Sequence, residues 1–68
     1  MPIVENLIEN LEKIRDMLLS SVSNLADREK ANSGNDEVLR DLREKKLILY
    51  ALAAIAEAQI AQFRLRGY

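Results

Sequence analysis

The chain has 68 residues, of which 49% are apolar, and its 10 basic and 11 acidic residues give a net charge of −1. This length allows one domain at most, and the near-neutral charge supplies neither a basic surface for phosphate backbones nor an acidic block. The chain contains no cysteine and no histidine, which removes disulfides, thiolate metal ligands and the commonest general base. Small chains without such staples usually complete their core by oligomerising.

A first helix is predicted over about residues 2–31. Pro2 suits the start of a helix, because its missing N–H would be unpaired there in any case. Serines and an asparagine over 20–24 weaken the helix, so a kink near Ser23 is the alternative to one long helix. The apolar residues that recur at steps of three and four, as on one helix face, are Val4, Leu7, Leu11, Ile14 and Leu18, and Leu25 resumes the pattern seven residues later.

A turn is predicted over residues 32–35, where the sequence reads Asn-Ser-Gly-Asn. Gly34 or Asn32 can adopt the left-handed conformation that ends a helix. A short loop between two helices of similar length favours an antiparallel hairpin. The candidates to cap the second helix are Ser33, Asn35 and Asp36.

A second helix is predicted over about residues 36–66, and its stretch 47–65 is apolar nearly all round. A surface helix needs only one apolar stripe, so this helix must be covered on several sides. We predict that two of its stripes form an oligomer interface. The small seam, at heptad spacing and mostly alanine, consists of Leu47, Ala51, Ala54, Ala58, Ala61 and Leu65. The bulky stripe consists of Ile48, Leu52 and Ile55.

The predicted fold class is therefore all-α: an antiparallel two-helix hairpin, forming a single domain, that assembles with copies of itself. One hairpin offers one inner face per helix and cannot cover the second helix on several sides. Two hairpins side by side form a homodimeric four-helix bundle with coiled-coil packing, which solves this problem. In layout this resembles the small plasmid RNA-regulating Rop hairpins, which also pair as dimers. No functional residue of that family aligns with this chain, so the resemblance implies architecture alone.

Acidic residues follow the first helix at steps of four, three and four: Glu5, Glu9, Glu12 and Asp16. In the predicted hairpin, Glu57 lies roughly level with Glu9 and Glu12, and carboxylates are the usual protein ligands of Mg²⁺. The competing interpretation places the acids on a solvated face opposite the core. It pairs Glu57 with Lys13 or with a lysine of a partner chain.

One spacing resembles the all-α nucleotide pyrophosphatases, whose helices carry Glu-x-x-Glu and Glu-x-x-Asp pairs. Glu9 and Glu12 match the first pair, whereas Asp41 and Glu44 have the spacing of the second with the two residues exchanged. The resemblance implies a magnesium-dependent hydrolase that uses Glu9, Glu12 and Glu57. We retain it as an alternative function.

The C-terminal tip offers a second alternative. Arg64 and Arg66 lie beside Phe63 and Tyr68, and such basic and aromatic groups bind nucleic acid by phosphate contacts and stacking. Two arginines are few for this purpose, so we do not expect nucleic acid as a partner. Phe63 is expected instead to close the core over Val4 and Leu7.

The sequence as a whole favours a small non-enzymatic interaction or scaffold protein that acts as a homo-oligomer, with another protein as a possible further partner. We assign no catalytic residue, metal or cofactor. A membrane span is not expected, because the apolar run 47–61 is shorter than the roughly 20 residues that a span needs. No signal peptide pattern is visible, and cytoplasmic is the default location.

Overall fold

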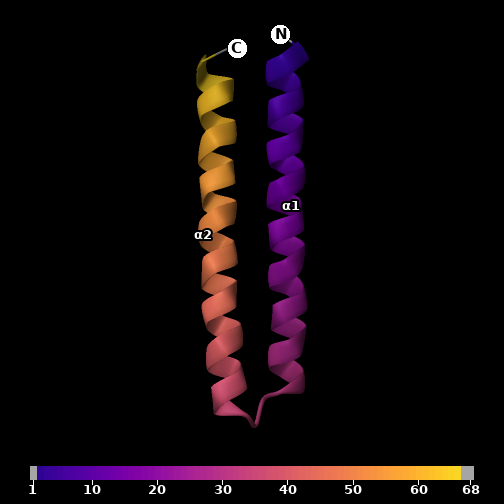
Figure 1. The fold of residues 1–68 in the computed structure, drawn as a ribbon, viewed down its shortest axis with the longest axis vertical. Coiled ribbons are helices and arrows are strands. Elements are labelled where there is room, and N and C mark those ends of the chain that lie inside the picture. Colours follow the sequence, from indigo (N-terminus) through magenta and orange to yellow (C-terminus); the bar gives the residue numbers. More distant parts are fainter. Residues whose placement is uncertain (1, 67–68) are drawn as a thin grey trace.

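The computed structural model describes residues 2–66, which form two long helices in an antiparallel hairpin (Figure 1). The first helix, α1, spans Pro2–Ala31, and the second, α2, spans Asp36–Arg66. The two helices lie side by side, with the turn at one end of the molecule. The hairpin is a rod of 51 × 14 × 11 Å. The predicted all-α class is confirmed, since the described residues are helical apart from the turn.

The serine-rich part of α1 remains helical, and the helix runs through Ser23 without a break. The hydroxyl of Ser21 donates a hydrogen bond of 3.1 Å to the carbonyl oxygen of Met17, one turn earlier. This local bond occupies a group that would otherwise compete for the helix backbone. The single long helix is therefore the correct one of the two predicted alternatives.

Two asparagines complete the helix ends at the turn. The backbone N–H of Asn32 donates to the carbonyl oxygen of Arg28 at 3.1 Å, and its side-chain amide donates to the same oxygen at 2.8 Å. The side-chain oxygen of Asn35 accepts a hydrogen bond of 3.2 Å from the backbone N–H of Val38. Asn35 is therefore the cap of α2, since it satisfies one of the unpaired donors of the first turn.

Gly34 does not adopt the left-handed conformation in which glycine commonly ends a helix. Its φ angle lies outside the left-handed region, and a methyl group on its α-carbon would meet no atom within 4 Å. Of the two candidates for a left-handed helix end, Gly34 and Asn32, the first is therefore excluded. The physical reason is that Asn32 satisfies the carbonyl of Arg28 through its own backbone and side chain.

The two helices meet along one seam at heptad spacing, which we call the inner seam. Every residue of the inner seam is buried or half-buried. On α1 the inner seam comprises Val4, Ile8, Leu11, Arg15, Leu18, Val22, Leu25 and Glu29. On α2 it comprises Leu39, Leu42, Lys46, Leu49, Ala53, Ala56, Ile60 and Phe63. The core is narrow, because the buried apolar side chains of residues 2–66 are limited to Val22, Leu25, Leu42, Ala53, Ala56 and Ile60.

The inner seam contains Val4, Leu11, Leu18 and Leu25 of the predicted stripe of α1, but not its other two residues. Leu7 and Ile14 were predicted to face α2, but they are exposed by 43% and 48%. Ile8 and Arg15 take their places in the seam. The helix carries two apolar stripes side by side, so spacing alone does not select the frame. Phe63 is half-buried at the same end as Val4, and Leu7 is exposed.

Candidate interaction surface

The largest feature of the hairpin is the apolar surface that it leaves uncovered. Eleven large hydrophobic side chains of the described residues are exposed, against six apolar side chains that are buried. Contiguous exposed apolar patches larger than a few hundred Å² mark interaction sites on soluble proteins. The exposed side chains are Ile3, Leu7, Ile14, Met17, Leu19, Leu47, Ile48, Tyr50, Leu52, Ile55 and Leu65.

Seven of these side chains share one side of the hairpin, which we call the apolar face. Each of them directly precedes an inner-seam residue in the sequence, as Ile14 precedes Arg15 and Leu52 precedes Ala53. In an antiparallel helix pair, the positions just before the seam on both helices lie on the same side. The apolar face carries Ile3, Leu7, Ile14 and Met17 from α1 and Ile48, Leu52 and Ile55 from α2.

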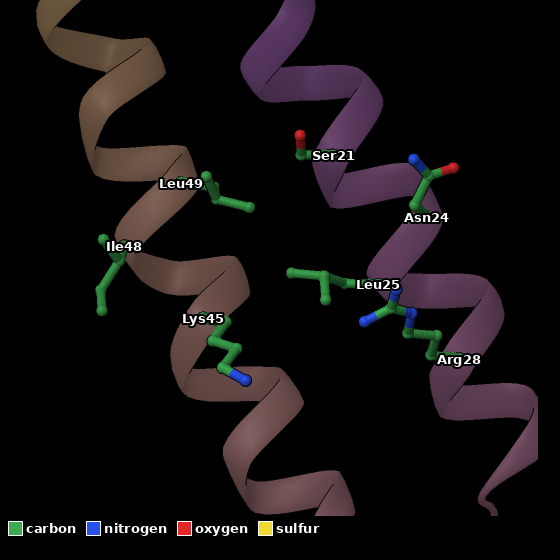
Figure 2. Close-up of a pocket in the computed structure, with 7 residues that line it drawn as sticks. All are labelled: Ser21, Asn24, Leu25, Arg28, Lys45, Ile48 and Leu49. Atoms are coloured by element: carbon green, nitrogen blue, oxygen red, sulfur yellow. The ribbon is translucent and has the colours of Figure 1, made fainter.

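A groove near the turn shows that these flanking positions meet on one side (Figure 2). It is open, has a volume of about 440 Å³, and has the seam residues Leu25 and Leu49 at its centre. Its walls come only from residues that precede the seam, on both helices. The wall residues are Ser21, Asn24 and Arg28 of α1 and Lys45 and Ile48 of α2.

The opposite side of the hairpin carries the residues that directly follow each seam residue, and we call it the ionic face. Arg64 lies 3.2 Å from Glu12 across this face, and both follow seam residues. The charged residues of the ionic face are Glu5, Glu9, Glu12, Asp16, Lys30, Arg40, Arg43, Glu57 and Arg64. The two faces of the hairpin therefore differ in chemical character.

The ion pairs described between the helices all use residues of the inner seam or the ionic face. Glu29, in the seam, pairs with Lys46 of the seam and with Arg43 of the ionic face. Arg15, also in the seam, pairs with Glu57. These pairs hold the two helices together on one side and leave the apolar face without such a link between α1 and α2.

Arg15 is the cation that pairs with the carboxylate of Glu57. Its guanidinium donates to the Glu57 carboxylate and, at 3.1 Å, to the carboxylate of Asp16. The hydrogen bond to Glu57, followed by the one to Asp16, raises the pKa of Arg15 above its ordinary value. Glu57 was predicted to pair with Lys13 or with a lysine of a partner chain. Within the hairpin its partner is Arg15 rather than Lys13, and the pairing with a lysine of a partner chain stays a prediction.

The carboxylates proposed for a hydrolase do not converge. Glu12 pairs with Arg64 and Glu57 pairs with Arg15, while Glu9 is exposed on the surface of α1. Within residues 2–66, no three acidic side chains lie together in an arrangement that could hold a metal ion. Glu12 is half-buried and reaches α2, so it does not lie opposite the core as the sequence suggested.

The basic tip is likewise divided by its contacts. Arg64 is engaged by Glu12, Arg66 is exposed, and Phe63 is half-buried in the inner seam. Tyr68, which the sequence grouped with them, lies outside the described residues. Within residues 2–66, Arg64 is thus engaged by Glu12, whereas Arg66 has no ion pair.

The predicted interface residues of α2 are all exposed, so α1 covers neither predicted stripe. The bulky stripe lies on the apolar face. The small seam divides between the ionic face and the outer side of α2: Leu47, Ala54 and Ala61 on the first, and Ala51, Ala58 and Leu65 on the second. Sequence reasoning missed the contribution of α1 to the apolar face. The signal was present but divided: Leu7 and Ile14 were assigned to the inner face of the first helix, while Ile3 and Met17 directly precede its residues Val4 and Leu18.

By length and composition, α2 could cross a membrane, and most of the apolar stretch concerned is exposed in the hairpin. The apolar core helix of a soluble protein meets the same criteria. The shortness of the run 47–61 is therefore not a sufficient argument against a span, and α2 as a whole meets the criteria.

No protein-family model, curated protein or solved structure matches this chain. The surface of the hairpin itself is therefore the guide to its function.

Proposed function

We propose that the protein is a small interaction or scaffold protein that acts as a homo-oligomer, most simply a dimer of hairpins. The observation that supports this proposal is the excess of large exposed hydrophobic side chains over buried ones. A chain of this kind gains free energy whenever another surface removes these side chains from water. A second copy is always available as that surface.

The exposed area supports the same proposal. The hairpin exposes 5184 Å², whereas a compact monomer of its 7.7 kDa mass exposes roughly 4,300 Å². The excess of roughly 900 Å² is close to the ~800 Å² that each partner contributes to a standard interface. Pairing would thus give the chain the exposed area per mass that stable small proteins have.

The contacts of the charged residues support binding rather than catalysis. Glu12 and Glu57 are each held by an arginine, and these pairs act between α1 and α2. The surface that remains available to a partner is apolar and extends over both helices. Such a surface suits the packing of helices against helices.

Multi-angle light scattering after size-exclusion chromatography tests the proposal. We expect a mass of about twice 7.7 kDa at micromolar concentration, because an interface of standard size supports such affinities. A folded, monodisperse monomer would contradict the proposal.

A second experiment, with lipid vesicles, tests the alternative that the protein inserts into a membrane, since α2 meets the criteria for a span. The protein is incubated with phosphatidylcholine vesicles and centrifuged. We expect it to remain in the supernatant as the oligomer. Quantitative recovery with the vesicles, with loss of the oligomer, would instead favour a membrane protein and overturn the proposal.

A further inference from the structure

We infer that the second copy packs on the apolar face and that the small seam of α2 stays outside the interface. This inference rests on the proposed homo-oligomer and specifies its surface. It moves the contact from the alanines of the small seam to a surface built by both helices. The residues placed at its centre are Ile14, Met17, Leu52 and Ile55.

The distribution of charge selects the apolar face. Its central part carries aliphatic side chains and the neutral Asn10 but no charged residue, while Arg28, Asp41 and Lys45 lie toward the turn. Asp41 and Lys45 already pair with each other at 2.8 Å along α2. Burying this face therefore removes apolar area from water without stripping water from an unpaired central charge.

The ionic face is a poorer contact for the same reasons. It carries nine charged residues, and desolvation of paired charges can exceed their mutual attraction. Its large exposed apolar side chains are Leu19, Leu47 and Tyr50, against seven on the apolar face, and Ala54 and Ala61 are small side chains that bury little area. A partner on the ionic face would bury less apolar area and desolvate more charged groups than a partner on the apolar face.

The shape of the apolar face favours a second copy as the occupant. Two contacts set the alignment of the helices: Arg15 pairs with Glu57, and Ser21 lines the groove with Ile48. The residues of α2 on the apolar face, 48–55, therefore lie beside about residues 16–23 of α1. The apolar residues of α1 lie nearer its N-terminal end, over 3–17. The aliphatic side chains thus form a stripe that runs diagonally from one helix to the other.

A two-fold axis that lies in the plane of the interface, either along the stripe or at right angles to it through its middle, superimposes the stripe of one copy on the stripe of the other. A two-fold interface uses the same patch on both copies. The polar corners support this arrangement, because Ser21 and Asn24 on α1 and Gln59 and Gln62 on α2 flank the stripe. Two hairpins joined in this way cross each other, and their polar corners form the rim of the contact.

Single cysteines introduced into the cysteine-free chain test this assignment. The variants Ile55→Cys and Met17→Cys place a thiol on the apolar face, and Ala58→Cys places one on the small seam a single helical turn from Ile55. In the hairpin alone all three positions are exposed. The rate of reaction with a maleimide polymer is measured in the native protein at high and low concentration, together with the molar mass at each concentration.

We expect the thiols at 55 and 17 to react about tenfold or more slowly in the assembled protein than after dilution, since labelling then requires dissociation. The thiol at 58 should react equally fast under both conditions. If a cysteine at 55 or 17 dissociates the oligomer while one at 58 leaves its mass unchanged, the apolar face is again the contact.

Two other outcomes overturn the inference, and they are distinguishable from failure of the proposed function. An oligomer in which the thiol at 58 is protected, alone or together with that at 55, places the small seam in the interface. An oligomer in which neither is protected places the contact elsewhere. A monomer at all concentrations, in the unaltered chain, overturns the proposed homo-oligomer itself.

Discussion

At the residue scale, the turn depends on side-chain hydrogen bonds more than on glycine. Asn32 closes the end of α1 and Asn35 opens α2, each through its amide side chain. Short polar side chains suit these positions because they replace the helix partners that terminal backbone groups lack. The sequence identified the turn but left three candidates for the cap, since serine, asparagine and aspartate all satisfy a first-turn donor.

Replacing the cap should lower stability measurably. Asn35→Ala removes the acceptor for the N–H of Val38, so we expect a loss of about 1 kcal/mol in the free energy of unfolding. Urea unfolding followed by circular dichroism measures it. The matched control is Ser33→Ala at an exposed turn position, which should change stability little. A larger loss of stability for Ser33→Ala than for Asn35→Ala would contradict the assignment of Asn35 as the cap.

Replacing the turn glycine, unlike replacing the cap, should not lower stability. Gly34→Ala should leave the protein equally stable or stabilise it by about 0.4–1 kcal/mol, because alanine restricts the unfolded chain where the folded backbone accepts it. The open space at Gly34 and its φ outside the left-handed region support this sign. Thermal unfolding checks it, and clear destabilisation would show that the turn requires a conformation that only glycine adopts.

At the element scale, the two helices could be predicted from local signals, whereas the way they face each other could not. Helices were predicted over about 2–31 and 36–66, and the structure has them at Pro2–Ala31 and Asp36–Arg66. The facing residues depend on partners far apart in the sequence. Arg15 and Glu29 interrupt the seam of α1 and look unfavourable there until their partners on α2 are known.

The same difficulty applies to α2. A helix that is apolar nearly all round shows several stripes of equal quality, and period alone does not rank them. The predicted small seam was the most regular of them, yet α1 packs on a different frame that includes Ala53, Ala56 and Ile60. Candidate interface residues could therefore be predicted for α2, but the contribution of α1 to the apolar face required the frame of the hairpin.

Two neighbouring alanines distinguish the inner seam from the small seam. Ala56 is buried and Ala58 is exposed. Ala56→Leu should therefore overpack the hairpin and destabilise it by ~1–3 kcal/mol, while Ala58→Leu should leave its stability and its mass nearly unchanged. Denaturant unfolding and light scattering measure the two effects. A reversed order of effects would mean that the helices meet in the other frame.

The seam ion pair supplies a further test of the frame. Glu29 and Lys46 have side chains that are 18% and 25% exposed, so their contact is only partly screened by water. Glu29→Lys places a third cation beside Lys46 and Arg43 and should destabilise the protein by about 1–3 kcal/mol. Combining it with Lys46→Glu restores an opposite pair and should recover part of that loss. No recovery in the double variant would show that the two side chains are not coupled.

At the scale of the whole molecule, the hairpin has an ionic side that joins its helices and an apolar side that remains uncovered. A two-layer rod cannot enclose a chain in which 49% of the residues are apolar, because each helix is covered along one seam only. Free energy is therefore available from contact with a further layer of helices. The proposed assembly of two hairpins supplies that layer from the same chain.

The concentration dependence of thermal unfolding tests this account most directly. If folding and assembly are coupled, the melting temperature must rise with protein concentration, because association stabilises the native state by mass action. We expect a steady rise over a hundredfold range of concentration, with a helical signal that is lost in one transition. A high melting temperature that is identical at every concentration would contradict the account, since the hairpin would then be stable with its apolar face uncovered.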